Sequence, residues 1–382
     1  MDEKEKLAYI LKQFRIEGEI LVYRWIPTGH INTAYYVALY NGKEMYQFLV
    51  QRVNTYVFRD PVGMMRNIEL LTEHVRKAEP SMEKRRRLHF RHTRDRRNYI
   101  VLHDGVVMGP GEPFDPLDER YEFWRVYNYI EYSKSFETAE GNAEVLRRSG
   151  KAFGKFLKQL SDFDASQLME SIPHFHDTAY RLQALFDTVA ADPLGRAAAC
   201  GEEIRLIREN ADFGCTLCRQ IQRGELPIRV THNDTKTNNI LFDVDTLDPL
   251  VIIDLDTCMP GLACYDFGDT IRFAACTAQE DQSENMRLDL ELMGAYTEGY
   301  LSEAGSVLTT AEIESLATGA AVITLELASR FLMDYLMGDK YFRIEYPDQN
   351  LKRAQAQLKL FEDMMLHLDD MNKIIRTIAQ KR

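Results

Sequence analysis

The fold is decided by the stretch Val230-Thr231-His232-Asn233-Asp234-Thr235-Lys236-Thr237-Asn238-Asn239-Ile240-Leu241-Phe242. It contains the pattern H-x-D-x-x-x-x-N, framed by apolar residues on both sides. Fifteen residues after Asn239, the apolar run 250–253 ends in a second carboxylate, Asp254. The four residues between Asp234 and Asn239 allow one short loop to present both side chains to the same cleft.

These three side chains meet the needs of phosphoryl transfer. A carboxylate at the accepting hydroxyl must take or orient its proton as the bond to phosphorus forms, and we assign this role to Asp234. An amide oxygen and a second carboxylate must hold Mg²⁺ on the phosphates of ATP, because hard cations prefer oxygen ligands. Asn239 and Asp254 are the predicted ligands. Asp and Asn after a strand often only cap turns. The second strand, which ends in Asp254, favours a role in phosphoryl transfer instead.

Two further carboxylates follow this strand. Asp266-Phe267-Gly268 spells a protein-kinase motif, but it lies 27 residues past Asn239, and Asp254 already supplies the carboxylate at the end of the strand. We therefore expect Asp266 to brace the loop through hydrogen bonds to its backbone, or to cap a helix. Asp256 would lie on the same side as Asp254 if the strand continued, and would then reach metal or substrate.

The segments before this stretch change from a helix to strands. Apolar spacing and turn residues predict helices at 4–15 and 61–78, strands at 20–23, 34–40, 45–53 and 124–130 with an Asn41-Gly42 hairpin turn, and further strands with a charged turn in 84–104. From 140 onward the chain is mostly helical, with a strand-rich island near 227–254.

This layout predicts an α+β fold of two lobes, like that of protein kinases. A β-rich N-lobe with one main helix spans 1–127 and binds the nucleotide. A hinge at 128–133 brings the backbone around Glu131 to the adenine. A larger, mostly helical C-lobe at 134–382 carries the catalytic loop and the acceptor site.

The predicted N-lobe holds weaker signals. Gly29 lies between two strands, where a glycine and its neighbour His30 let backbone N–H groups approach the ATP phosphates. Glu69 occupies the place on helix 61–78 where kinases keep the partner of a strand lysine. The strand, however, has Gln51 at the lysine position. Arg52 is a candidate replacement, although one step along a strand points to the opposite face.

The composition is that of a folded globular protein, with 45% hydrophobic and 28% charged residues among 382. The net charge of -12 disfavours nucleic acid and membrane partners, and no obligate protein partner is evident. The six cysteines form no disulfide framework, and Cys215-x-x-Cys218 is expected to be two reduced thiols in a helix. The charged N-terminus has no signal peptide and no stretch reads as a membrane span, so we expect a cytoplasmic location.

The catalytic stretch, with Asp254 and Asp266, resembles the aminoglycoside and choline kinase superfamily. Within it, the chain is similar to the branch of bacterial N-acetylhexosamine 1-kinases. The similarity extends over roughly residues 18–365 and is carried by the segments Gly29-His30-Ile31-Asn32-Thr33, Met65-Arg66-Asn67-Ile68-Glu69, Phe163-Asp164-Ala165-Ser166-Gln167-Leu168, His174-Phe175-His176-Asp177-Thr178, Ile253-Asp254-Leu255-Asp256-Thr257 and Asp334-Tyr335-Leu336.

The resemblance implies transfer of the ATP γ-phosphate to the anomeric 1-hydroxyl of N-acetylglucosamine or N-acetylgalactosamine. It also implies a protein-kinase-like fold, catalysis by Asp234, and magnesium held by Asn239 and Asp254. Contacts to the sugar would come from Arg330 and Tyr341 in the late helical region.

Two other functions stay open. A kinase for an amino alcohol, amino acid or aminoglycoside would need an acidic or aromatic-lined pocket for its cationic acceptor. A neutral sugar needs directional hydrogen bonds, and Arg330 at the cleft would favour it. The missing strand lysine would also fit a nucleotide-binding pseudokinase, but such proteins usually lose the base or a metal ligand, and Asp234, Asn239 and Asp254 are present.

Overall fold

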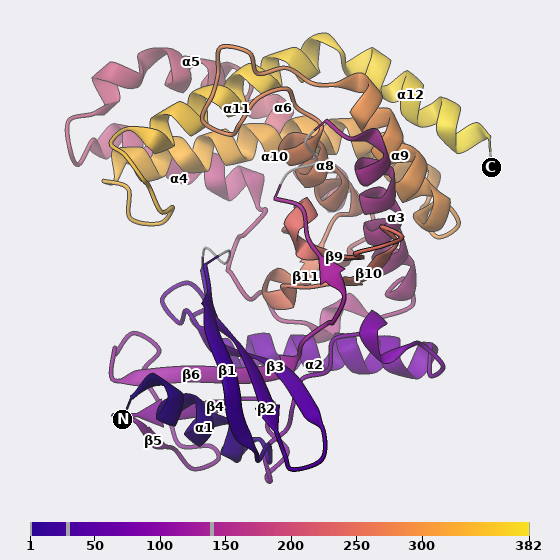
Figure 1. Ribbon diagram of the computed structural model, residues 1–382. Helices are drawn as coiled ribbons and strands as arrows, with labels where there is room; N and C mark the ends of the chain where they lie inside the picture. The colour runs from indigo at the N-terminus through magenta and orange to yellow at the C-terminus, as the bar shows by residue number, and fades with distance from the viewer. Residues whose placement is uncertain (1, 28–30, 138–140, 382) are drawn as a thin grey trace. The chain divides into compact units, whose positions relative to one another are not determined.

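The computed structural model describes residues 2–27, 31–137 and 141–381 (Figure 1). The chain divides into two compact units. The first comprises Met1–Ser133, Met169–Pro173 and Leu255–Thr257, and the second holds the remaining residues. The two short segments at 169–173 and 255–257 correct the expected division, which placed all of 134–382 in one lobe.

The first unit is built on an antiparallel sheet of six strands in the order β1-β2-β3-β6-β4-β5. Its elements are α1 (Glu3–Gln13), β1 (Glu19–Ile26), β2 (Thr33–Tyr40), β3 (Met45–Val53), α2 (Pro61–Ala78), the 3-10 turn η1 (Lys84–Arg86), β4 (Ile100–His103), β5 (Val106–Val107) and β6 (Tyr121–Asn128).

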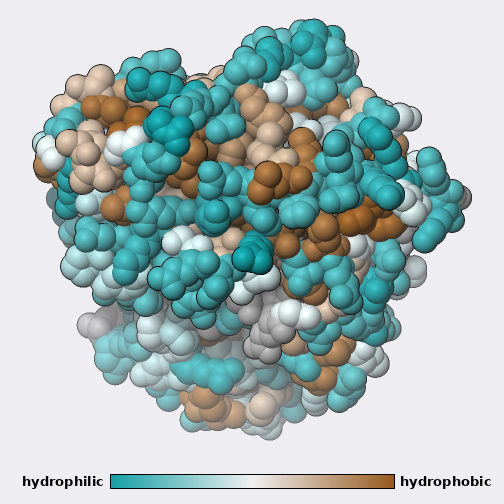
Figure 2. All heavy atoms as spheres, turned by 90° about the horizontal axis from the view of Figure 1, so that it is seen from above, coloured by the Kyte–Doolittle hydropathy of each residue, from teal (hydrophilic) through white to brown (hydrophobic). Residues whose placement is uncertain are grey.

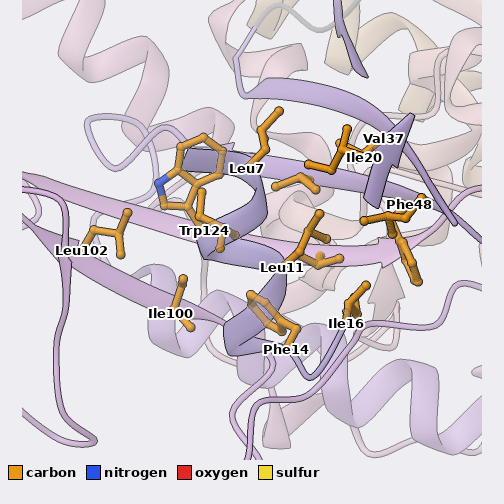
Figure 3. Packing of buried hydrophobic residues seen from close by; sticks show 14 residues of the cluster. Leu7, Leu11, Phe14, Ile16, Ile20, Val37, Phe48, Ile100, Leu102 and Trp124 are labelled. Atoms are coloured by element: carbon orange, nitrogen blue, oxygen red, sulfur yellow. The ribbon is translucent and has the colours of Figure 1, made fainter. Parts of the chain in front are cut away.

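The two faces of this sheet carry different side chains because strand residues alternate. One face packs on α1 through a buried apolar cluster that includes Leu11, Phe48 and Trp124 (Figure 3). The other face carries Gln51 and Arg125, and the Arg125 guanidinium contacts Met65 Sδ of α2 at 3.6 Å. The alternation therefore places a polar set of side chains on the α2 side of the sheet.

The helices and most strands of the first unit confirm the sequence prediction, but residues 84–99 do not form strands. In this segment Phe90 makes an isolated bridge to Tyr127, and η1 is its only regular element among the described residues. The apolar residues Leu88 and Phe90 are buried nonetheless. They fill the interior from an irregular segment that pairs with β6 at a single bridge, so their burial produced a strand-like pattern without a regular strand.

The second unit is mostly helical and contains two small sheets, one of two strands in the order β11-β8 and one of three in the order β10-β9-β7. The junction strand β7 (Ser133–Lys134) precedes α3 (Ala143–Gln159), η2 (Ala165–Gln167), α4 (Thr178–Ala191), η3 (Ala197–Cys200), α5 (Gly201–Glu209), α6 (Ala211–Gly214), α7 (Thr216–Gln222), β8 (Arg229–Thr231), η4 (Thr237–Asn239), β9 (Ile240–Asp243), β10 (Pro249–Ile252), η5 (Leu255–Thr257, which clusters with the first unit), β11 (Met259–Gly261), α8 (Ala263–Ala274), α9 (Leu290–Ala304), α10 (Thr310–Leu336), α11 (Gln349–Leu366) and α12 (Leu368–Gln380). β8 pairs with β11, and β9 pairs with β10.

Helix α10 is the central helix of the second unit and packs against α8, α11 and α4. It is the one described helix that is long and apolar enough to cross a membrane. In the structure, 83% of its apolar window is buried inside the fold, which is the pattern of a core helix. The face of the molecule in Figure 2 is mostly hydrophilic, with apolar side chains in small patches.

Helices α3 and α9 cross at very short range because glycines stand at the crossing. A Cβ atom on Gly150 would overlap the Tyr296 carbonyl, and a Cβ atom on Gly299 would overlap the Arg147 carbonyl. The backbones therefore approach closely enough that no side chain fits between them.

We predict that Gly299→Ala lowers the free energy of unfolding by about 1–3 kcal/mol, because the added methyl group forces the helices apart. Gly294→Ala on the same helix is the matched control, since its new Cβ would meet Ile374 at an ordinary 3.8 Å. That control should stabilise the protein by about 0.5–1 kcal/mol through helix propensity. Thermal denaturation of both variants checks this, and equal effects would contradict the crossing geometry.

Candidate active site

Asp234 and Asn239 lie in the loop between β8 and β9 and are hydrogen-bonded to each other. The Asn239 Nδ2 atom donates to the Asp234 carbonyl at 2.8 Å and to Asp234 Oδ2 at 2.9 Å. Asn239 is buried, whereas the Asp234 side chain keeps 28% of its surface exposed. The loop therefore presents one accessible carboxylate whose orientation is set by a buried amide.

Asp254 lies two residues past the end of β10 and is exposed. Its neighbour Ile253 donates its N–H to the Asn239 carbonyl at 2.9 Å, and the Ile253 carbonyl lies 3.0 Å from His232 Nε2. Ile253 is thus hydrogen-bonded to the loop at a residue before Asp234, His232, and at a residue after it, Asn239. The structure brings Asp234, Asn239 and Asp254 to the same loop cluster of the second unit.

Asp254 has an unusual backbone for a residue that is not glycine. Its φ is +60°, in the left-handed region that costs an L-residue roughly 1–2 kcal/mol. Non-glycine residues in this conformation cluster at functional sites, where surrounding contacts hold them. Asn233, next to Asp234, has the same feature with a φ of +64°.

The side chains fit a magnesium ion. Both hydrogen bonds of the Asn239 side chain use its nitrogen, so the amide is oriented with Oδ1 accepting no hydrogen bond from a described residue. An amide oxygen and an exposed carboxylate are ligands of the kind that Mg²⁺ takes, with water and phosphate oxygens completing its shell. Within residues 2–27, 31–137 and 141–381, no three His, Cys, Asp or Glu side chains form a metal cluster.

Helix α8 holds the loop through two buried carboxylates. Asp266 accepts the N–H groups of His232 and Asn233, each at 2.8 Å, and Asp269 accepts the N–H of Thr235 at 2.9 Å. Asp266 lies inside α8, not in a loop or at a helix cap. Burial raises the pKa of Asp266 to about 6. The expected bracing role of Asp266 is therefore what the geometry shows.

Lys236 is a residue that the sequence analysis passed over. Its Nζ atom lies 3.3 Å from Asp234 Oδ1, and the attraction of Asp234 raises the pKa of Lys236. The signal was present in the sequence, because a cation two residues past the candidate base shares its short loop. Lys236 therefore places a positive charge beside the Asp234 carboxylate.

The predicted acceptor residues Arg330 and Tyr341 lie together in the second unit. The Arg330 guanidinium lies over the rings of Phe175, Tyr341 and Phe342, at 4.7, 5.7 and 5.6 Å from their centroids. Arg330 is 7% exposed, whereas Tyr341 is 45% exposed. This arginine–aromatic cluster is thus a buried cation with an accessible aromatic edge.

Asp334 fixes the segment that carries Tyr341. Its carboxylate accepts the N–H groups of Lys340, Tyr341 and Phe342 at 2.9–3.0 Å and the Asn350 amide at 3.0 Å. The position of the aromatic side chains after α10 is therefore set by one buried carboxylate on α10.

His176 connects this region with the catalytic loop. Its Nδ1 lies 2.9 Å from Glu326 Oε1 on α10, and its Nε2 lies 3.4 Å from the Asn233 carbonyl. Asp177 caps α4 by accepting the Tyr180 N–H. The sequence analysis names His176 only within a segment that carries the family resemblance, and its partner Glu326 could not be read from the sequence because it lies 150 residues away.

In the first unit, Glu69 does not contact the strand position at which kinases have a lysine. Glu69 on α2 contacts His92 and Asn98, not the side chain at the lysine position. Gln51 at that position accepts hydrogen bonds from Arg125 of β6. Arg52 faces the α1 side of the sheet, where its Nη1 lies 3.6 Å from Glu122 Oε1. Arg52 therefore does not replace the lysine on the α2 side.

Asp256 does not continue the strand as expected. It lies in the 3-10 turn η5, is 2% exposed, and forms an ion pair with Arg125. The predicted phosphate contacts Gly29 and His30 lie outside the described residues.

Glu131, the predicted adenine contact, lies in a segment that Arg85 contacts. The Arg85 Nη2 donates to the carbonyls of Glu131 and Tyr132 at 3.3 and 3.1 Å, and the Glu131 carboxylate accepts from Gln47. These residues line a cavity of about 920 Å³ in the first unit, together with Arg87 and other basic residues. Arg85 and Arg87 therefore line a cavity, whereas the sequence predicted a charged turn between strands in this segment.

We predict that Asp266→Asn loosens the catalytic loop, because the amide NH₂ would face one of two backbone N–H donors. The buried mismatch costs about 1–3 kcal/mol and should speed hydrogen exchange at His232 and Asn233. Asp289→Asn is the matched control, since Asp289 also accepts two N–H groups, those of Glu291 and Leu292, but at a helix cap where Asn serves equally. Unchanged exchange in Asp266→Asn would contradict the bracing role.

Comparison with known proteins agrees with this geometry. Residues 26–304, more than half of the chain, match the model of the phosphotransferase enzyme family, APH. A Plasmodium vivax ethanolamine kinase has 14% identity and a TM-score of 0.51, covering 88% of this chain and 82% of its own. A spectinomycin phosphotransferase in complex with ADP and spectinomycin has 12% identity and a TM-score of 0.54, covering 96% and 98%.

An aminoglycoside 2'-phosphotransferase in complex with GDP has 12% identity and a TM-score of 0.55, covering 97% of this chain and 100% of its own. At these identities the solved structures show the fold alone, and they confirm the predicted α+β, protein-kinase-like architecture with a β-sheet lobe and a helical lobe. The match of the family model shows more: this chain belongs to the phosphotransferase enzyme family of the aminoglycoside and choline kinases and is a small-molecule phosphotransferase.

Proposed function

We propose that the protein transfers the γ-phosphoryl group of ATP to the anomeric 1-hydroxyl of an N-acetylhexosamine, N-acetylglucosamine or N-acetylgalactosamine, giving the sugar 1-phosphate. The observation that carries the choice of acceptor is the arginine–aromatic cluster of Arg330, Phe175, Tyr341 and Phe342 in the unit that holds Asp234. A cationic acceptor would be repelled by this charge, whereas a neutral sugar accepts hydrogen bonds from a guanidinium and packs on aromatic faces.

A second arginine strengthens this argument. Burial, together with repulsion by Arg330, lowers the pKa of Arg181, so two cations lie close enough to repel each other. The carboxylate of Glu326 is already hydrogen-bonded to His176 and Thr178, and that of Asp334 to backbone N–H groups. The carboxylates of this region therefore serve the protein's own structure, which disfavours an amino alcohol or aminoglycoside.

The catalytic loop supplies the chemistry in this proposal. Asp234 accepts the proton of the acceptor hydroxyl. The hydroxyl oxygen forms a bond to the γ-phosphorus, while the bond between that phosphorus and the β–γ bridging oxygen breaks. Asn239 and Asp254 would hold Mg²⁺, which neutralises charge on the phosphate oxygens when bound. Asn239 also orients Asp234. An anomeric hydroxyl is more acidic than other sugar hydroxyls, so a carboxylate suffices as base.

We expect ADP release in the presence of N-acetylglucosamine or N-acetylgalactosamine, and none with their methyl glycosides, which lack a free anomeric hydroxyl. Asp234→Asn should lower kcat by roughly 10²–10⁴-fold, the usual contribution of a general base. A coupled ADP assay with a panel of acceptors measures both. Turnover on ethanolamine, choline or an aminoglycoside in place of the sugars would overturn the acceptor assignment, and no turnover on any acceptor would favour a pseudokinase.

We expect Arg330→Met to raise KM for the sugar by about tenfold or more, since a lost hydrogen bond to a charged group costs about 1.5–3 kcal/mol, while KM for ATP stays unchanged. Methionine keeps much of the apolar contact with the three rings. Arg208→Met is the matched control, because Arg208 also lies over a ring, Phe186, at 5.4 Å on a different pair of helices. An unchanged sugar KM in Arg330→Met would remove this arginine from the acceptor site.

A further inference from the structure

We propose that Arg125 is a positioning residue that replaces the strand lysine of related kinases and acts through Asp256 on the metal-binding carboxylate Asp254. The proposal rests on the phosphotransferase assignment and on Asp254 as a magnesium ligand. It does not depend on the identity of the acceptor.

Arg125 occupies the place opposite the missing lysine. Gln51, at the lysine position of β3, is the direct partner of Arg125 in the pairing of β3 with β6. Its Oε1 accepts from Arg125 Nε at 2.8 Å and from Nη2 at 2.6 Å. The substitution of glutamine for lysine is thus matched by a cation on the neighbouring strand, and the glutamine fixes the plane of that guanidinium.

The guanidinium makes a two-point contact with Asp256. Nη1 donates to Asp256 Oδ1, and Nη2 donates to Oδ2 at 3.0 Å. Both side chains are 2% exposed. Asn32 completes the carboxylate by donating from Nδ2 to Oδ2 at 2.7 Å, while its own Oδ1 accepts the Asn54 N–H at 2.9 Å. A buried ion pair persists only when its remaining donors and acceptors are satisfied in this way.

This geometry excludes a metal-binding role for Asp256. Both oxygens of Asp256 accept hydrogen bonds, so Asp256 is an anchor in this arrangement and not a metal ligand. The Nε, Nη1 and Nη2 atoms of Arg125 are all directed at Gln51 and Asp256. A lysine would bring a mobile point charge, whereas a planar arginine held at both edges sets a position.

Arg125 fixes the position of the backbone that follows Asp254. Leu255–Thr257 clusters with the first unit, and Asp256 is two residues past Asp254. Asp254 itself has a φ of +60°, in the left-handed region that Asp adopts more readily than most L-residues. On its N-terminal side Ile253 is held by the catalytic loop. Arg125, through Asp256, supplies the corresponding restraint on the C-terminal side.

The test measures binding of a non-hydrolysable ATP analogue by calorimetry, with Mg²⁺ and with EDTA, in the absence of any acceptor. We expect Arg125→Met to weaken the binding that depends on Mg²⁺ by tenfold or more, and the binding in EDTA by less than twofold. Asp256→Asn, which keeps the size of the side chain but loses its charge, should act in the same direction. Arg125→Lys should recover only part of the loss, because one ammonium cannot bridge Gln51 and both oxygens of Asp256.

A double variant separates positioning from stability. Arg125→Met with Asp256→Leu replaces both buried charges by apolar groups, which commonly restores stability. We expect its melting temperature to recover while its Mg²⁺-dependent affinity stays low. Recovery of that affinity together with the melting temperature would show that the pair is only structural and would overturn the proposal, as would full Mg²⁺-dependent affinity in Arg125→Met.

Glu122→Gln is the control on the same strand, since Glu122 contacts Lys6 and Trp124 on the α1 side. It should leave both affinities unchanged. Because no acceptor is present, a wrong assignment of the sugar would leave these results unaffected. The failure of this proposal and the failure of the proposed function are therefore distinguishable.

Discussion

The site depends on the contact between the Asp266 carboxylate and the backbone of the catalytic loop. His232 and Asn233 are buried, and Asn233 has a left-handed backbone, so their N–H groups cannot pair in a regular strand or reach water. An unpaired buried N–H costs free energy comparable to a lost hydrogen bond. Asp266 satisfies both donors from one side chain, and Asp269 satisfies the Thr235 N–H. The irregular loop that carries Asp234 is stable only because α8 stands behind it.

The position of α8 depends in turn on the central helix. A Cβ atom on Gly268 would overlap the backbone of Ala320, and one on Gly319 would overlap that of Cys264. Two glycines thus allow α8 and α10 to approach at backbone distance. Since α10 also carries Glu326, Arg330 and Asp334, the same helix supports the loop through α8 and organises the proposed acceptor region. One packing arrangement sets both halves of the reaction that we propose for the second unit.

Several local features were predictable because they depend on residues close in sequence. Helix α2 begins and ends where the sequence placed it, since Asp60 caps it, a proline occupies its first turn and its apolar spacing is regular. Segment 84–99 was predicted wrongly. Leu88 and Phe90 are buried there, but pairing with β6 is limited to one bridge between Phe90 and Tyr127, and strand pairing depends on residues elsewhere in the chain. Burial alone produced the strand-like pattern.

The sequence by itself determined the chemical types and spacing of Asp234, Asn239 and Asp254, because these lie in one short loop and at the end of the next strand. Lys236 lies in the same short loop, but the sequence analysis gave it no role. Only the tertiary structure decided that Arg125 pairs with Asp256, 131 residues away, and that Glu326 reaches His176. Such pairs form between side chains that packing brings together, and local spacing carries no information about which distant charge arrives. The residues of the loop could therefore be predicted from the sequence, whereas the distant side chains that hold the loop and its surroundings in place could be identified only from the fold.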